Sequence, residues 1–524
     1  MLGLEKQQGL FDVSQIAPGL VDSGSVYGLL AARREELFPA SDFGGLFPSS
    51  LGRPSIPPAV MCSALLLQAL DSLTDREAAE ALTFDLRWKA ACGTGVNVPA
   101  FHFSAFSYWR GKIAASDRPD LIGQAVAKVV EECGVLRGKK RRAVDSTVLD
   151  DAVARQDTVT LLARQVRAVA RVVPGLAGWI GSLPGGEHYQ PGAGKPDIDW
   201  DDKASKEKLV CTLVNDALAV VGRAEAITGL TEVQRDAVGL LALLAGQDVE
   251  PAEGSDGSDG RWTIAKNVAK DRVLSTVDPD ARHARKTRSD KRDGFKAHVV
   301  VEPDTGIITA AKLTKAAGPG CADGQAGAGL LAEDLAVAAG EVDEVLADGA
   351  YATVEMYQVC DQVGAFPVIK PQLLIPVVPG GFTIDDFAVD PEVTTVTCPA
   401  GQTRRLPASG QASFRNCGTC PLKPRCTTSN NRAVHITDRH LAQREHRSRV
   451  ADAGKVFSDS YRSKRPMVER SIAWLTRKAR RVPYRGAEKN DAWLEIRVAA
   501  INLKRLLNLG LRHDNGVWQL MGTV

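Results

Sequence analysis

Two short apolar segments separated by a helical stretch constrain the fold of this chain most strongly. The segments EVDEVLADGAY at 341–351 and AFPVIKP at 365–371 have strand character, and Thr353–Val363 between them has helical character. A strand, a helix and a second strand in this order form a βαβ unit, which belongs to a sheet covered by helices. We therefore predict an α/β fold built around these residues.

Further strand signals precede this unit. Residues 143–149 carry β-branched side chains at 144, 147 and 148. The segment GFKAHVVVEPDTGIITAAKLT at 294–314 contains two β runs around a PDTG turn, which predicts a hairpin. With an Ala/Gly-rich helix near 322–339, the core is predicted to run β, helical insertion, β, β, α, β, α, β.

The N-terminal part of the chain is predicted to be helical. Residues 53–92 read as two or three short helices, and Pro57 and Pro58 suit the start of the first. Ser72 and Asp75 provide capping-box-like chemistry for the start of a second helix. The resulting bundle has the character of a helix-turn-helix domain. Such a bundle either contacts DNA or only packs against a neighbouring domain, and both interpretations stay open here.

A helical insertion is predicted between the first strand and the hairpin. VTLLARQVRAVARVV at 159–173 has apolar residues at helical spacing. KLVCTLVNDALAVV at 208–221 and TEVQRDAVGLLALL at 231–244 are expected to form a helical pair, the second opened by a Thr231/Gln234 capping box. The repeat GSDGSDG at 254–260 is typical of a flexible loop and ends the insertion.

Composition and charge limit the classes of protein to which this chain can belong. The 524 residues are 44% hydrophobic and 24% charged, as in soluble globular proteins. No run of eighteen apolar residues and no signal-peptide pattern is found, so we expect an intracellular protein, which in a bacterium means the cytoplasm. Residues 461–513 contain 14 Lys/Arg but four Asp/Glu. This imbalance favours a polyanionic partner over a merely solvated helix face.

Three acids stand in positions where carboxylates are uncommon or informative. Asp348 ends a short apolar strand, where site residues of open α/β sheets usually lie. Asp145 is the one internal charge of the 143–149 strand, so it lies at an exposed edge or is functional. Glu469 is the single acid of YRSKRPMVERSIAWL at 461–475. Three carboxylates from two strands and a helix can hold two divalent cations, which promote in-line phosphoryl displacement.

Each acid also has an ordinary interpretation. Asp348 fits an Asp-Gly turn, and Arg465 and Glu469 are spaced for a surface ion pair on a helix. Glu469 nevertheless lies beside an apolar stripe and so points toward the edge of the core, where an acid pair on the sheet is within reach. The stripe consists of Val468, Ile472, Leu475 and Ala479. Nearby alternatives for the two aspartates are Asp150, Asp151 and Asp343.

Four of the ten cysteines cluster in one segment. Cys417 and Cys420 form a CxxC pair, Cys426 follows after five residues, and Cys398 lies upstream. Four thiolates suit a tetrahedral structural zinc site. Unliganded thiols in a reducing cytosol and an iron–sulfur cluster are the alternatives. The other six cysteines are too few for a disulfide scaffold, and we expect buried free thiols.

Five ordered blocks resemble the bacterial insertion-sequence transposases of the DDE class. The region from GRPSIPP to DLRWKAACG resembles their InsH-type N-terminal domain, and AVDSTV resembles the strand of the first aspartate. DPDARHARKTRSDKRDGFKAHVVVEPDTGIIT at 278–309 resembles the block after the insertion, and VLADGAYATVE the strand of the second aspartate. Residues 461–507 resemble the glutamate helix and its continuation.

The resemblance implies a ribonuclease-H-like mixed sheet with helices on both faces. It also implies that Asp145, Asp348 and Glu469 form the acidic triad, with Mg²⁺ or Mn²⁺ as cofactor. The related signature places a Tyr seven and an Arg four residues before the glutamate, and a Lys seven residues after it. Arg465 matches this pattern, but Tyr461 is eight residues before Glu469.

Two further positions depart from the related signature. Arg462 stands at the position of the Tyr, and Thr476 stands where the Lys is expected, with Lys478 just beyond. The departures leave the triad in place and put the roles of Tyr461 and Lys478 in doubt.

The implied domain organisation follows the blocks. We expect an N-terminal segment at 1–44, a helical DNA-binding domain at 45–115 and a linker helix at 116–138. The catalytic core is expected at 139–370 and 461–510, with the helical insertion at 152–262, a β-rich Cys-containing insertion at 371–460 and a tail at 511–524.

The resemblance also implies partners. The expected activity is cutting and joining the ends of the protein's own element, with double-stranded DNA of the terminal inverted repeats and the target as substrate. A homodimer in a synaptic complex is expected, associated with the bacterial nucleoid and not with a membrane. Residues expected to contact phosphates are Arg462, Arg465, Arg470, Arg477, Lys478, Arg480 and Arg481. The alternatives are a catalytically inactive DNA-binding protein and a metal-dependent nuclease that does not join strands.

Overall fold

The computed structural model describes residues 1–4, 11–17, 19–49, 51–266, 269, 271–285 and 290–521. Residues 286–289, which belong to the block at 278–309, lie outside the described residues, as do residues 522–524 of the expected tail. Within the described part of the chain, no helix is long and apolar enough to cross a membrane.

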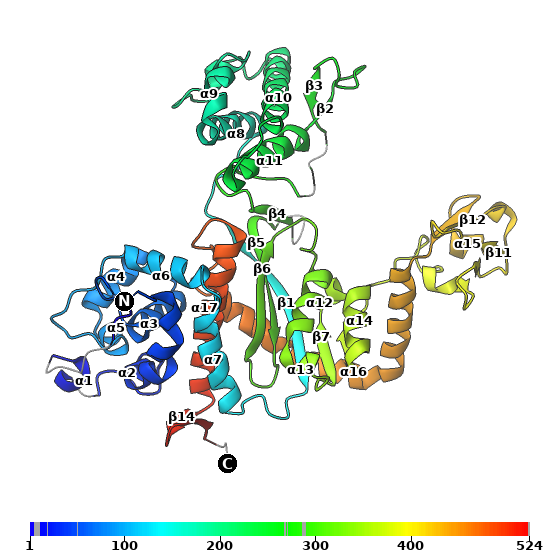
Figure 1. Cartoon of the computed structure of the whole chain (residues 1–524). Helices are drawn as coiled ribbons and strands as arrows, with labels where there is room; N and C mark the ends of the chain where they lie inside the picture. Colours follow the sequence, from blue (N-terminus) through cyan, green and yellow to red (C-terminus); the bar gives the residue numbers. More distant parts are fainter. Residues whose placement is uncertain are drawn as a thin grey trace.

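A six-stranded mixed sheet lies at the centre of the molecule (Figure 1). The order is β4-β5-β1-β7-β8, and β6 pairs with β5. The β5 strand runs antiparallel to its neighbours, whereas β1, β7 and β8 run parallel to one another. The strands are β1 (Arg141–Asp150), β4 (Arg282–Arg285), β5 (Lys291–Val301), β6 (Ile308–Lys315), β7 (Glu344–Ala347) and β8 (Phe366–Ile369). The predicted α/β fold, hairpin and βαβ unit are confirmed; β4 was not predicted.

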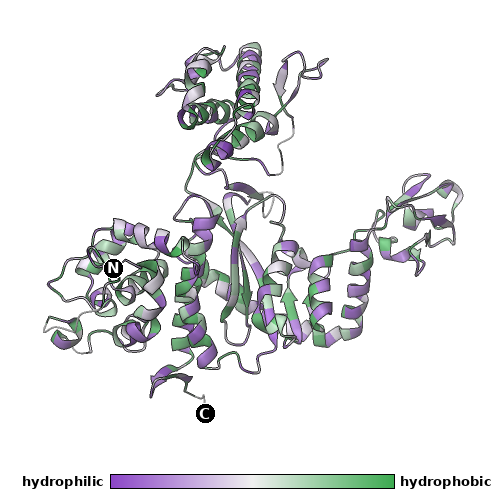
Figure 2. Ribbon diagram, in the orientation of Figure 1, coloured by the Kyte–Doolittle hydropathy of each residue, from purple (hydrophilic) through white to green (hydrophobic). Residues whose placement is uncertain are grey.

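Helices cover both faces of this sheet. Successive strand residues point to opposite sides, and apolar side chains on each side form a core with the helices there. Ala143 of β1 belongs to the apolar core on one face, which is covered by α16 (Asp438–Thr476) and α17 (Ala487–Asn508). Val144, the next residue, belongs to the core on the other face. The helices there are α12 (Asp323–Glu333), α13 (Leu335–Ala338) and α14 (Val354–Val363). Figure 2 shows that the strands between these layers are largely hydrophobic.

A buried ion pair connects the start of β1 to the N-terminus of α13. Arg142 Nε lies 2.9 Å from Asp334 Oδ2, and the two side chains are only 2% and 1% exposed. Asp334 also accepts hydrogen bonds from the backbone N–H groups of Ala336 and Val337, so it caps α13. Removing one member of such a pair leaves an uncompensated buried charge.

We therefore expect Asp334→Ala to destabilise the protein by about 3–5 kcal/mol in denaturant unfolding. The matched control is Asp343→Ala, because Asp343 is 65% exposed and pairs with Lys140 at 3.4 Å across the surface. That control should change stability by less than about 1 kcal/mol. Equal losses in the two variants would show that burial does not determine the strength of the Arg142–Asp334 pair.

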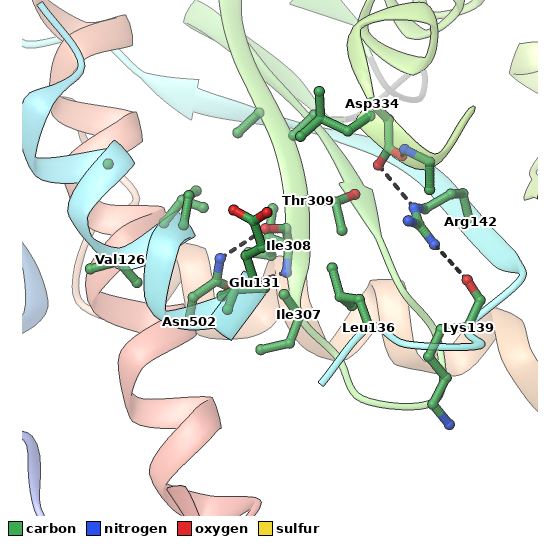
Figure 3. A pocket seen from close by; sticks show the side chains of 18 of the residues that line it. Val126, Glu131, Leu136, Lys139, Arg142, Ile307, Ile308, Thr309, Asp334 and Asn502 are labelled. Carbon is green, nitrogen blue, oxygen red and sulfur yellow. Dashed lines mark hydrogen bonds and ion pairs between the residues drawn. The ribbon is translucent and has the colours of Figure 1, made fainter. Parts of the chain in front are cut away.

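The free side of β6 is covered by α17. Asn502 donates from its side-chain amide to the Ile308 carbonyl and accepts from the Ile308 N–H, and Asp491 accepts from the Leu313 N–H. These bonds protect an edge strand from pairing with another chain. A groove of about 1230 Å³ lies beside them, between α7 (Leu121–Glu132), β6 and α17 (Figure 3). None of the three candidate acids lines this groove.

One carboxyl group in this groove makes stability depend on pH. Burial, followed by the charges of Asp491 and Asp120, raises the pKa of Glu495 from its ordinary value to about 7. The folded state therefore holds a proton that the unfolded state has released, and this stabilisation is lost as pH rises from about 4.5 to about 7. Glu495→Gln should raise the melting temperature at pH 8 more than at pH 4. A variant that melts like the unchanged protein at both values would contradict this.

The N-terminal helices share one core with the C-terminal part of the chain. Ala499 and Leu503 of α17 are buried in the same apolar cluster as Leu66 of α3. Trp518, within the expected tail, is only 5% exposed in this cluster and lies on β15 of a hairpin. The interpretation of 511–524 as a tail is therefore wrong for its described residues.

These N-terminal and C-terminal elements have the following bounds. The helices are α1 (Val13–Ile16), α2 (Val26–Leu37), η1 (Ala40–Leu46), α3 (Pro58–Asp71), α4 (Asp75–Phe84), α5 (Leu86–Ala91) and α6 (Ser104–Ala114). The hairpin strands are β14 (Leu511–Asp514) and β15 (Val517–Leu520). A capping box opens α4, but its residues are Thr74 and Glu77, and Ser72 instead ends α3 in a left-handed conformation.

The helical insertion has its own apolar core. Leu162 of α8, Leu213 of α10 and Leu241 of α11 are buried in it. The predicted helices and the Thr231/Gln234 capping box are confirmed. Its elements are α8 (Thr158–Val172), α9 (Pro174–Gly181), η2 (Gly186–Tyr189), α10 (Lys203–Glu225), α11 (Glu232–Gln247), β2 (Val249–Pro251) and β3 (Trp262–Ile264). The GSDGSDG loop joins β2 to β3 and closes the insertion.

The Cys-containing insertion consists of short strands around a small core that includes Phe387, Val396 and Phe414. Its strands are β9 (Ala388–Val389), β10 (Thr395–Thr397), β11 (Thr403–Arg405), β12 (Gln411–Phe414) and β13 (Arg432–His435). Its helical turns are η4 (Ile384–Asp386), η5 (Cys417–Thr419) and α15 (Lys423–Cys426). The β character agrees with the prediction.

The expected boundary at residue 460 lies inside α16. This helix begins at Asp438 and kinks at Gly454, whose φ of 48° and ψ of −112° suit glycine. Before the kink, Gln443 donates to the Ala352 carbonyl and His446 lies 2.8 Å from the Ile369 carbonyl. The residues from 438 onward therefore pack on the elements of the central sheet, and the β insertion ends earlier than expected.

Candidate metal centre

Asp145 and Asp348 come from neighbouring parallel strands. The register pairs Ala143 with Leu346, and its continuation by two residues brings Asp145 beside Asp348. Ala143 and Leu346 both face the α16 side, so alternation directs the two aspartates to that side as well. Because β1 is an interior strand, the edge interpretation of Asp145 is wrong.

Asp145 is bound by an arginine of α16. Arg465 Nη2 lies 2.8 Å from Asp145 Oδ2, and the side chains are 7% and 15% exposed. Burial raises the pKa of Asp145 above its ordinary value, Arg465 opposes that shift, and the charge of Asp348 adds to it. The Nε and Nη1 atoms of Arg465 are buried, and neither has a hydrogen-bond partner among the described residues. Arg465 is therefore not the exposed phosphate contact that the sequence predicts.

Asp348 occupies the end of β7 in the expected way and also takes part in a turn. Its carboxylate accepts a hydrogen bond of 2.8 Å from the Ala350 N–H and thereby caps η3 (Gly349–Tyr351). The turn interpretation and the site interpretation are compatible, since the capped carboxylate keeps a second oxygen.

Glu469 lies on α16 one turn after Arg465. Its side chain is exposed, whereas Val468 and Leu475 of the predicted stripe are fully buried. Arg465 pairs with Asp145, and among the described residues no ion pair joins Arg465 to Glu469. The surface-pair interpretation of Glu469 is therefore not what the structure shows. The helix places Glu469 beside the residue that contacts the first aspartate.

The three acids do not form a closed ligand set. Across the described ranges, no group of three or more His, Cys, Asp or Glu residues has the geometry to hold a metal ion. Of the alternative aspartates, Asp150 pairs with Arg292 and Asp343 pairs with Lys140, and burial raises the pKa of Asp151 to about 6. Carboxylate oxygens remain the donors that Mg²⁺ and Mn²⁺ prefer.

A polar network supports the opposite side of β1. Ser146 donates to Asp323 at 2.6 Å, and Lys296 Nζ lies 3.1 Å from the same carboxylate. Tyr351 is buried on this side, and the charge of Asp323 acts with burial to raise its pKa. These residues connect the strands of both aspartates. Asp323 was not predicted, because an acid in the first turn of a helix is ordinary.

The other basic residues expected to contact DNA are on the surface. Arg462 and Arg470 are exposed on α16. The other exposed residues of the set expected to contact DNA are Arg477, Lys478, Arg480 and Arg481. They follow the end of α16, and the Arg480 carbonyl accepts a hydrogen bond from the Asp150 N–H at the end of β1. This connection brings the basic segment to the sheet.

The four clustered cysteines line one small cavity of about 20 Å³, close to the size of a single water molecule. Burial raises the pKa of Cys426, and its three fellow thiols lie close enough to raise it further. Cys417 is buried and its thiol contacts the Phe414 carbonyl at 3.7 Å. The thiols thus converge, as the spacing predicts, without the closed geometry of a metal site.

Comparison with known proteins adds two matches. Residues 26–112 match the family model "Transposase domain (DUF772)", and residues 397–507 match "Transposase DDE domain". The second match contains the Cys cluster and Glu469, whereas Asp145 and Asp348 lie outside both. No curated protein and no solved structure matches the chain. The two family matches support an insertion-sequence DDE transposase.

Proposed function

We propose that this transposase cuts and joins the ends of its own element by metal-dependent phosphoryl transfer at Asp145, Asp348 and Glu469. One observation carries the proposal: the register of β1 and β7 directs both aspartates to the face covered by α16, where Arg465 binds Asp145 and Glu469 follows one turn later. The family supports a transposase function.

The catalytic core is proposed to be ribonuclease-H-like. This is supported by three antiparallel strands followed by two parallel strands, with helices on both faces. In such a sheet the end of a central parallel strand is open for a site. The end of β7, where Asp348 lies, has this position.

The acidic and basic side chains of the site have different proposed roles. Asp145, Asp348 and Glu469 would hold Mg²⁺ or Mn²⁺, which supplies Lewis-acid chemistry for an in-line displacement. Without a metal, Arg465 offsets the charge of Asp145. The exposed basic residues of α16 and of 477–481 would hold the DNA backbone, which gives a salt-sensitive affinity.

A further part of the proposal concerns assembly and location. Transfer of two element ends to one target requires both ends to be held together, so we propose a homodimer in a synaptic complex with double-stranded DNA. The protein would act in the bacterial cytoplasm on DNA of the nucleoid. The N-terminal helical domain is proposed to contact DNA, which its match to a transposase domain supports.

The Cys cluster is proposed to bind a structural zinc ion through Cys398, Cys417, Cys420 and Cys426. The proposal is supported by the chemistry of four thiols around one cavity of about 20 Å³. Zinc would connect η5, which begins at Cys417 and is followed by Cys420, to the β10–β11 hairpin and to α15. The role is structural, because four protein ligands leave no open coordination position.

Incubation of the full chain with labelled element-end DNA and Mg²⁺ or Mn²⁺ tests the proposed function. Joined product supports a transposase, whereas cut but unjoined product supports a nuclease. Bound but uncut DNA supports an inactive DNA-binding protein. Omission of the metal should abolish both chemical products and leave binding.

A further inference from the structure

A strongly basic groove separates the helical insertion from the catalytic core. It has a volume of about 850 Å³ and is lined on one side by Arg164, Arg167 and Arg171 of α8. The core contributes Arg485 together with Thr276. Among the described residues that line it, none is Asp or Glu. A groove with four arginines and no acid favours a polyanion.

The arginines of α8 form a stripe. They are spaced at i, i+3 and i+7, which places them on one face of the helix. Arg164, Arg171 and Arg485 are exposed. The stripe covers about 10 Å at a rise of 1.5 Å per residue, enough to face two or three phosphates of one DNA strand.

These side chains keep their charges free for a ligand. Among the described residues, none of the four forms an ion pair. By contrast, Arg155 near the start of the insertion pairs with Asp293, and Arg272 just after its end pairs with Asp248. Arg167 donates only to backbone carbonyls, those of Ala163 and Ala193. Burial lowers the pKa of Arg167, and the nearby charge of Arg164 lowers it further.

Acids near the groove are already engaged. Asp216 accepts from the Gly185 N–H and the Tyr189 hydroxyl within the insertion. Asp278 accepts from the Gly486 N–H. Glu187 pairs with His188. In the part of the chain that the structure describes, the four arginines therefore have no acidic partner that would compete with a bound anion.

We propose that this groove binds the sugar–phosphate backbone of duplex DNA and that this is the function of the helical insertion. The inference rests on the proposed function, which supplies DNA as the substrate. The Val482 N–H bonds to the Asp150 carbonyl, so the segment that leads to Arg485 passes beside the end of β1. Asp150 lies about 17 Å along the strand from Asp145, or roughly five base pairs of duplex. A duplex with one phosphate at the acids can therefore reach the groove.

The test removes the stripe from the full-length protein. Arg164, Arg167 and Arg171 are changed together to Ala, and binding to a duplex carrying the terminal inverted repeat is titrated at several salt concentrations. The slope of log affinity against log salt should become shallower by about 2 to 3, because each lost phosphate contact removes about 0.9. Arg485→Ala, on the core wall, should make the slope shallower by about 1.

The matched control removes three charges from the same insertion outside the groove. Lys203, Lys206 and Lys208 of α10 do not line it, and Lys203 is 88% exposed. Their joint change to Ala should leave the slope unchanged. The groove inference is overturned if the α8 and Arg485 variants bind with the slope of the unchanged protein, or if the control loses as much. If the unchanged protein binds no duplex at all, the proposed function fails together with the groove.

Discussion

Glu469→Gln is expected to lower DNA cleavage and joining by about a thousand-fold or more. Loss of a metal ligand removes several kcal/mol of transition-state stabilisation, and each 1.4 kcal/mol is tenfold in rate. Glu469 is exposed, so the melting temperature and the DNA affinity should stay close to those of the unchanged protein. Single-turnover cleavage of labelled element-end DNA with Mg²⁺ provides the measurement.

The matched control for this variant is Glu488→Gln, because Glu488 is also an exposed helical glutamate and lies in the first turn of α17. It should retain full activity. Persistent cleavage by the Glu469 variant would show that this residue is not a ligand. Asp145→Ala is a less specific test. It leaves the buried charge of Arg465 without its partner Asp145 and should therefore also destabilise the fold by roughly 3 kcal/mol.

Cys417→Ser is expected to abolish zinc binding and to unfold the β insertion. A structural zinc site contributes on the order of 10–16 kcal/mol in small zinc domains, far more than the small core around Phe387 and Phe414 is expected to supply. Metal analysis of the purified protein should find about one zinc per chain, and the variant should contain none. Proteolysis should then cut the variant within 387–436.

Cys133→Ser is the control, because Cys133 is half-buried and lies outside the cluster. It should keep its zinc and its protease resistance. Iron with visible absorption in place of zinc would replace the zinc assignment by an iron–sulfur cluster. Protein that contains no metal and still resists protease would refute both.

The strands that carry the two aspartates are predictable because their β-branched and apolar side chains are typical of strands. β-Branched residues around Asp145 mark a strand, and the apolar run before Asp348 marks another. Helical spacing and the Thr231/Gln234 box likewise identify the insertion. Local patterns of this kind follow from periodicity and capping, which need no knowledge of the rest of the chain.

What the sequence does not reveal depends on contacts between distant residues. β4 reads Arg-His-Ala-Arg and pairs through its backbone, so no apolar alternation marks it. The start of α16 is polar, and His446 is buried where it contacts the Ile369 carbonyl and the Tyr357 ring. Arg465 is expected from its basic surroundings to contact phosphates, yet the fold buries it against Asp145.

Metal-directed cleavage of the protein tests the convergence of the three acids most directly. Fe²⁺ loaded in place of Mg²⁺, with ascorbate and peroxide, generates hydroxyl radicals that cut the backbone close to the bound metal. Cuts near residues 145, 348 and 469, all suppressed by excess Mg²⁺, are the expected result. Cuts near 145 and 348 without one near 469, or no Mg²⁺-sensitive cuts at all, would contradict a shared metal centre.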